Sequence, residues 1–255
     1  MANKTYIAWT RHTFNISWGC TKVGTGCDGC YADSLSHRYG YDLWGPRKPR
    51  RTFGEEYWRE PLKWNRLAES EGERHRVFCS SMCDIFEDHP TIDQERVKLW
   101  PLIAKTPWLD WQLLTKRAKR IAANLPTDWD VERYHNVWLG VSIENNDYVE
   151  RADHLRVIPA AQRFISYEPA LGPLDKLDLT GINWLIYGGE SGPHYRKHDI
   201  QWARDMRDRC AAAGVAFFFK QSAARFPSRG TLIDGVEIKQ FPARRISLNV
   251  IGESS

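Results

Sequence analysis

Short apolar runs alternate with amphipathic stretches along most of the chain. The runs are continuous rather than alternating, and β-branched and aromatic residues dominate them. Strands that are buried on both faces have this pattern, as in parallel sheets covered by helices. We therefore predict six buried strands, at Val77–Met82, Trp111–Leu114, Val137–Ser142, Arg163–Tyr167, Asn183–Tyr187 and Val215–Phe219.

Helical patterns lie between these runs. The clearest begins at Asp199, a residue type that caps helix N-termini, and stops at Gly214, a frequent C-terminal residue. Apolar residues recur between them at helical spacing, at Ile200, Ala203, Met206 and Cys210. Two further helices are expected, one over Ile92–Lys105 with a kink or restart at Pro101, and one carrying Val149, Ala152 and Leu155 behind an Asn145 or Asn146 cap.

The order of strands and helices indicates an α/β fold. Strand, helix and strand in succession predict βαβ units and a parallel sheet, and the length fits a partial or complete TIM-type (β/α) barrel of about six or seven units. Residues 43–76 lack a strand pattern and mix basic with aromatic side chains, so we expect an insertion or lid there. Residues 223–255 are expected to form a short C-terminal extension of this single domain, which spans residues 1–255.

Composition narrows the class of protein. The 255 residues contain 36 Lys and Arg against 32 Asp and Glu, so the formal net charge is +4. No apolar run approaches the roughly 18 residues that a membrane span needs, and the N-terminal residues lack the apolar core of a signal peptide. We therefore expect a cytoplasmic protein that does not contact a membrane, and one in which disulfides are uncommon.

Polar residues follow each predicted strand. In parallel α/β folds, ligands bind at the carboxyl ends of the strands. Ser142 and Glu144 follow one strand, and Gly188, Gly189 and Glu190 follow another. The two glycines would let backbone approach a ligand closely, although a tight turn would explain them equally well. Further strand ends carry Asp84, Thr115, Lys116, Arg117, Tyr167, Glu168, Lys220 and Gln221, and we expect a functional rim there.

Three of the six cysteines are clustered. Cys20, Cys27 and Cys30 have the spacing C-x6-C-x2-C in a glycine-rich segment. The C-x2-C pair is typical of two thiolates on one metal or cluster, and three ligands leave one coordination position open. Two alternatives remain, three incidental buried cysteines or a structural zinc site with Cys83 or His37 as fourth ligand.

The other three cysteines give less information about function. Cys79 and Cys83 lie at a predicted strand end, where they would either hold a second cluster or pack as small apolar side chains. Cys210 lies on the apolar face of a predicted helix, and we expect it in the core.

Several strings of residues occur together in this chain. They are Asn15–Cys20, Gly26–Ala32, Leu113–Arg117, Leu139–Asn145, Gly188–Gly192 and Phe217–Gln221. Over about residues 8–222 the chain resembles phage-encoded and bacterial three-cysteine-motif proteins, which are regarded as radical-S-adenosylmethionine-like with a TIM-type barrel. The spacing departs from the C-x3-C-x2-C of most radical-SAM enzymes. The Gly-Gly-Glu string also follows a late strand here, rather than an early one.

The resemblance implies a cofactor and a reaction. A [4Fe–4S] cluster would be held by Cys20, Cys27 and Cys30, with S-adenosylmethionine on the fourth iron. Reductive cleavage would give a 5′-deoxyadenosyl radical that abstracts hydrogen from substrate, and flavodoxin or ferredoxin would donate the electron. Ser142, Glu144 and Glu190, with Gly188 and Gly189 beside them, would bind S-adenosylmethionine.

The substrate is not specified by the sequence. The phage residence of the family and its kinship with photoproduct repair suggest nucleic-acid repair or modification. The basic residues Arg47, Lys48, Arg50 and Arg51 would then bind phosphates, or they would form a solvated loop. A second class of function is a zinc-stabilised nucleic-acid-binding or interaction protein without catalysis. Neither the substrate nor the oligomeric state follows from the residues.

Overall fold

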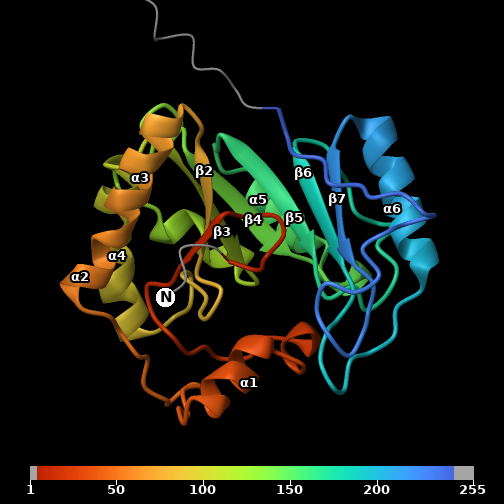
Figure 1. Cartoon of the computed structure of the whole chain (residues 1–255), viewed down its shortest axis with the longest axis horizontal. Helices are drawn as coiled ribbons and strands as arrows, with labels where there is room; N and C mark the ends of the chain where they lie inside the picture. Colours follow the sequence, from red (N-terminus) through yellow and green to blue (C-terminus); the bar gives the residue numbers. More distant parts are fainter. Residues whose placement is uncertain (1–4, 244–255) are drawn as a thin grey trace, which may run out of the picture.

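A seven-stranded parallel sheet forms the centre of the molecule in the computed structural model, which describes residues 5–243 (Figure 1). The expectations for residues 1–4 and 244–255 lie outside this range. The strands follow one another in sequence order across the sheet. They are β1 (His12–Phe14), β2 (His75–Cys79), β3 (Leu109–Thr115), β4 (Val137–Ser142), β5 (Gln162–Tyr167), β6 (Trp184–Gly188) and β7 (Ala216–Gln221).

The sheet curls without closing. Each neighbouring pair of strands is parallel, and β1 and β7 are the two ends of the strand order. The fold is therefore a partial TIM-type barrel, which confirms the predicted fold class. No helix among residues 5–243 is long and apolar enough to cross a membrane.

Six strands lie where the sequence predicts them, and two differences stand out. The run over Val77–Met82 ends as a strand at Cys79, because Ser80 takes a left-handed conformation with φ of 73°. β1 was not predicted, since it has three residues and its register with β2 is what defines it.

The helices of the described residues are α1 (Tyr31–Arg38), α2 (Glu55–Trp58), α3 (Glu60–Glu71), α4 (Pro90–Ala104), α5 (Glu150–Arg156) and α6 (Ile200–Ala213). α3, α4, α5 and α6 pack on the outside of the curled sheet, whereas α1 lies across from the strand ends (Figure 1). Single 3-10 turns occur at η1 (Thr25–Cys27), η2 (Ala118–Arg120), η3 (Ala122–Asn124) and η4 (Asn146–Tyr148).

The predicted caps are present at two of these elements. The Asp199 side chain accepts a hydrogen bond from the Gln201 amide at the start of α6, and Gly214 ends it in the left-handed conformation. Asn145 caps η4, which leads into α5. Pro101 lies inside α4, which continues through it to Ala104.

Residues 43–76 divide into two parts. The second part forms α2 and α3, and α3 packs against β2 and β3 as the crossover helix of the first βαβ unit. The first part, residues 43–54, is a loop in which Arg51 forms an antiparallel bridge with Trp18, just before Cys20.

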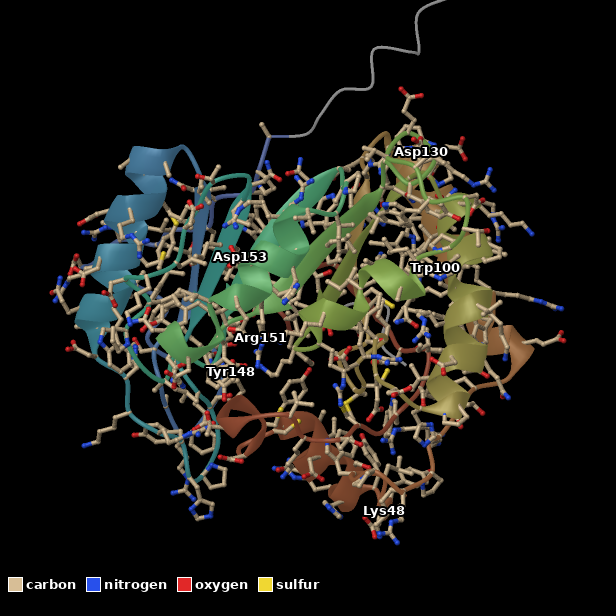
Figure 2. The ribbon with its side chains drawn as sticks, turned by 180° about the vertical axis from the view of Figure 1, so that it is seen from behind. Lys48, Trp100, Asp130, Tyr148, Arg151 and Asp153 are labelled. Atoms are coloured by element: carbon tan, nitrogen blue, oxygen red, sulfur yellow. The ribbon has the colours of Figure 1, made fainter. Side chains whose placement is uncertain are left out.

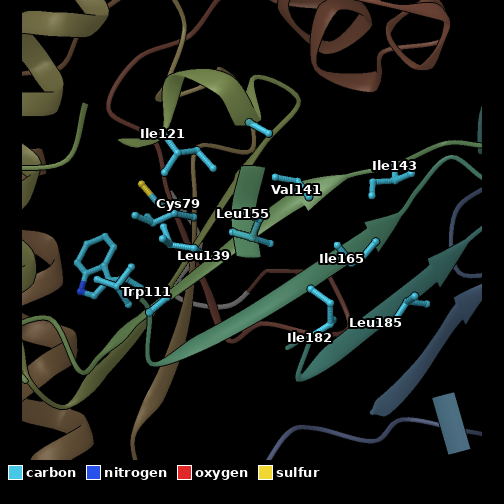
Figure 3. Close-up of a cluster of buried hydrophobic side chains, with 14 of the residues drawn as sticks. Cys79, Trp111, Ile121, Leu139, Val141, Ile143, Leu155, Ile165, Ile182 and Leu185 are labelled. Atoms are coloured by element: carbon cyan, nitrogen blue, oxygen red, sulfur yellow. The ribbon is translucent and has the colours of Figure 1, made fainter. Parts of the chain in front are cut away.

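Alternate residues of the strands point to two different cores. The outer core is largely aliphatic and lies between sheet and helices, where Leu139, Val141 and Leu155 meet (Figure 3). The inner cluster fills the concave side of the sheet and is mainly aromatic. It consists of Trp9, Phe78, Trp138, Phe164, Trp184, Ile186 and Phe218. Both faces are thus buried, as the continuous apolar runs predict.

Candidate functional site

The inward-facing residues change character along each strand. On β4, Trp138 is followed two residues later by Gly140 and then by Ser142. On β5, Phe164 gives way to Ser166 and then Glu168 beyond the strand, and on β7 Phe218 is followed by Lys220. Because side chains two residues apart share a face, the aromatic inner cluster ends and a polar surface begins at the carboxyl ends.

A cavity of about 280 Å³ opens at this polar surface. Ile7, Trp9, Phe78 and Leu114 from the inner cluster and its neighbours line it together with polar strand ends and the segment Cys20–Ala32. In Figure 1, α1 and the segment before it lie across from the strand ends. The cavity therefore lies between the cysteine segment and the barrel.

Three of the five strand-end residues predicted to bind a ligand line the cavity. They are Ser142, Gly189 and Glu190. Glu144 and Gly188 lie behind the lining. Gly188 has no room for a side chain, because an added Cβ would overlap the Glu168 carboxylate.

The cysteines separate into cavity and core positions. Cys20, Cys27 and Cys30 all line the cavity, and Cys83 lines it as well. Cys79 and Cys210 are buried, and both pack in the outer core. His37 contacts Asp33 instead, with 3.2 Å between Nε2 and Oδ1.

Burial is the main influence on the thiol pKa values of Cys20 and Cys30. It raises the pKa of Cys20 to about 12, and the carboxylate of Asp84 adds to this while the Arg117 guanidinium opposes it. Burial also raises the pKa of Cys30, although the nearby backbone amides of Asp33 and Ala32 act in the opposite direction. A bound metal would stabilise the thiolates that burial disfavours.

The three thiols share one cavity without forming a compact ligand set. Within residues 5–243, no three His, Cys, Asp or Glu side chains are grouped so that they could hold one metal ion. Cys20, Cys27 and Cys30 nevertheless all line the same cavity.

Glu144 supports the cysteine segment from behind. Its carboxylate forms ion pairs with Lys116 and with Arg151, where Nη1 and Oε2 are 2.9 Å apart. An added Cβ on Gly26 would overlap this carboxylate, so the glycine permits the close approach. Arg151 also stacks on Tyr148, with its guanidinium 4.1 Å from the ring centre, and the two residues lie next to each other in Figure 2.

Glu190 is held by a residue that the sequence analysis missed. Arg196 donates from Nε to Oε2 over 2.9 Å and from Nη2 to Oε1 over 2.6 Å. Burial alone would raise the pKa of Glu190, but these hydrogen bonds and the positive charge outweigh it and hold the pKa below its usual value. Arg196 also donates to the Thr25 carbonyl over 2.9 Å, so it fastens the cysteine segment to the strand end.

Two further polar pairs line the cavity. Lys220 Nζ lies 2.7 Å from Glu168 Oε1, which joins the ends of β7 and β5. Arg117 Nη1 lies 2.9 Å from Asp84 Oδ2, which joins the end of β3 to the loop after β2. Their positions just past strands could be predicted from the sequence, but the pairing could not.

The basic loop is largely committed to contacts within the protein. Arg50 is buried and donates to both carboxylate oxygens of Glu87, over 2.9 and 2.8 Å. The Arg51 guanidinium lies 5.0 Å from the rings of Trp18, Tyr41 and Phe53. Lys48, at the outer edge of the molecule in Figure 2, pairs with Asp42.

Comparison with known proteins gives a family. The profile of the family described as "Protein of unknown function (DUF5131)" matches residues 4–242. The chain belongs to the DUF5131 family. No curated protein matches the DUF5131 chain in sequence.

Solved structures similar to this DUF5131 chain include those of spore photoproduct lyase. One, a variant with bound AdoMet and dinucleoside spore photoproduct, has a TM-score of 0.47 and 12% identity, and the match covers 78% of this chain and 61% of that one. Another, complexed with dinucleoside spore photoproduct, has a TM-score of 0.46 and 14% identity over 76% and 59% of the two chains. The chain thus spans about three fifths of the length of these structures.

Proposed function

We propose that this chain is a radical-SAM-like iron–sulfur enzyme. The observation that carries the proposal is the convergence of Cys20, Cys27 and Cys30 on one cavity at the carboxyl end of a parallel partial barrel. When bound, a [4Fe–4S] cluster with S-adenosylmethionine would supply reductive cleavage to a 5′-deoxyadenosyl radical, which abstracts hydrogen from substrate. The protein would bind and orient the ligands and exclude water.

The residues of this chain would have distinct roles. The three thiolates would hold the cluster. Ser142 and Glu190 would bind S-adenosylmethionine, and the backbone of Gly189 would approach it closely because the glycine has no side chain. The Glu190 carboxylate can accept hydrogen bonds besides those from Arg196, because each oxygen has two lone pairs. Glu144 would support this wall from behind Gly26, and Gly188 would leave room for the Glu168 carboxylate.

Substrate and partners belong to the same proposal. The electron would come from a protein such as flavodoxin or ferredoxin. Nucleic acid is the proposed substrate class, on the resemblance to phage-encoded proteins with kinship to photoproduct repair. Because Arg50 and Arg51 are engaged in contacts within the protein, phosphates would bind other basic residues of this loop, such as the exposed Arg47.

Metal analysis after anaerobic purification tests the cluster. We expect about four irons and four sulfides per chain, lost in Cys27→Ala. Cys210→Ala is the matched control, since this thiol is buried against the outer core and should not affect iron content. One zinc per chain without visible iron–sulfur absorbance would instead support the zinc-stabilised binding protein.

Cofactor cleavage tests the reaction itself. The loaded protein, given a strong reductant and S-adenosylmethionine, should release 5′-deoxyadenosine. Glu190→Gln should weaken S-adenosylmethionine binding in equilibrium dialysis while the iron content stays unchanged. A full cluster with no cleavage would mean a redox or structural role and would contradict the proposed enzyme.

A further inference from the structure

Thr21, the residue after Cys20, forms hydrogen bonds through its amide, its carbonyl and its hydroxyl group. Its amide donates to Glu87 Oε1 over 2.7 Å, and its carbonyl accepts from Arg117 Nη2 over the same distance. Its hydroxyl oxygen lies 3.1 Å from Arg50 Nη2. Arg50 lies in the loop before α2, Glu87 in the loop after β2, and Arg117 just after β3. Three separate segments therefore hold Thr21 in place.

The same network reaches the neighbouring thiol. Arg117 donates from Nη1 to Cys20 Sγ over 3.7 Å and to Asp84 Oδ2 over 2.9 Å. Asp84 is itself held by the Thr115 hydroxyl, at 2.7 and 2.8 Å from its two oxygens. The Arg117 guanidinium therefore has a fixed orientation, with one N–H aimed at sulfur.

The far end of the cysteine segment is held differently. Cys30 directly precedes α1 and has no side-chain capping hydrogen bond, although the nearby backbone amides of Ala32 and Asp33 favour its thiolate. These amides are neutral, whereas the donor to Cys20 carries a full charge. Hydrogen bonds to ligand sulfur and nearby charge both tune the potential of an iron–sulfur cluster, and charge-assisted bonds are roughly twice as strong as neutral ones.

We propose that Arg117 is a positioning residue for Cys20, which holds this thiolate ligand in place and raises the reduction potential of the cluster through a charge-assisted N–H···S hydrogen bond. This inference rests on the proposed function, because it requires Cys20 to be a cluster ligand. Loss of the positive charge and of the hydrogen bond makes the added electron less favourable. The potential of the cluster then falls.

Three variants of the whole chain test the inference. Arg117→Gln removes the charge, Arg117→Lys keeps it, and Arg120→Gln is the control. Arg120 is the last residue of η2, the 3-10 turn that directly follows Arg117, but it donates to the Phe86 carbonyl over 2.8 Å and pairs with Asp88 rather than with a thiol. Circular dichroism and thermal unfolding establish that each variant is folded.

The measurements are the cluster midpoint potential, from a redox titration followed by electron paramagnetic resonance, and the rate of iron loss to a chelator. We expect a more negative potential and about 10- to 100-fold faster iron loss in Arg117→Gln, as for other changes to groups that orient metal ligands. Arg117→Lys should recover part of both, and Arg120→Gln should match the wild type.

The two possible failures are distinguishable. A wild-type protein without iron contradicts the proposed function. A wild-type cluster with an unchanged potential and iron-loss rate in folded Arg117→Gln overturns the role of Arg117 alone. Equal effects of Arg117→Gln and Arg120→Gln would mean a general structural effect, and would overturn it as well.

Discussion

Two layers inside the same barrel differ sharply. The inner cluster is aromatic and almost free of charge, whereas the layer above it contains ion pairs such as Arg117 with Asp84 and Lys220 with Glu168. Both layers come from the same strands, often only two to four residues apart. A short step along each strand therefore separates residues that stabilise the fold from residues that surround the cavity.

The largest effect should come from removing the centre of the inner cluster. Trp184 is fully buried, and its ring contacts those of Trp138, Phe164 and Phe218. Trp184→Ala leaves a cavity in a packed core, so we expect a loss of about 3–5 kcal/mol in the free energy of unfolding. Urea unfolding measures it, with Val157→Ala, which is 79% exposed, as the control. A loss no larger than that of the control would show that this layer is not a stabilising core.

A smaller effect is expected where the two layers meet. An added Cβ on Gly140 would overlap the Phe164 ring from the neighbouring strand. Gly140→Ala should therefore cost about 1–3 kcal/mol through overpacking. Combining it with Phe164→Leu should cost less than the sum of the two single changes, because the smaller side chain makes room. Additive losses in a double-mutant cycle would contradict this packing.

The charged layer, unlike the inner cluster, should respond to acid. Burial opposes the charge of Glu87, but hydrogen bonds from Arg50 and Thr21 hold its pKa below the ordinary 4.5. A lowered pKa in the folded state gives stability that is fully present above pH 4.5 and is lost as the pH falls through the folded value.

The loss of stability in Glu87→Gln is the smallest effect that we predict. Wild type should be more stable than Glu87→Gln near pH 7, and the difference should narrow below about pH 4.5. Urea unfolding across pH measures the difference. Glu69→Gln, on the exposed face of α3, is the control and should show little difference at any pH. A gap that stays constant into acid would mean that Glu87 acts through packing and not through its charge.

Most of the sheet could be predicted because burial on both faces leaves a strong apolar signal. β1 was not predicted, because its three residues, His12 to Phe14, pair only with β2 and are too few to give a strand pattern. The crossover helix α3 was not predicted, because only a few of its residues, such as Ala68, are buried and its many charged residues give a weak apolar pattern. Short elements depend on tertiary contacts that a local pattern does not contain.

The position of the candidate site could be predicted from the sequence, but the pairing of its charged residues could not. The cysteine spacing and the strand-end rule both point to the carboxyl-end cavity, where Cys20, Cys27, Cys30 and Ser142 lie. The partner of Glu190 was not predictable, because Arg196 lies in an irregular segment with no periodic pattern. Arg50 looked like a surface residue among other basic residues, and only the fold shows that it is buried.

The open side of the barrel has a consequence for self-association. An unpaired edge strand offers free amides and carbonyls to a second chain. At β7 the edge is occupied from within, since Phe219 donates to the Ile238 carbonyl over 2.8 Å and Gln240 donates to the Phe217 carbonyl over 3.1 Å. The segment after β7 thus acts as an internal blocker, and without residues 238–240 the protein would present a hydrophobic edge on which further copies could add as strands.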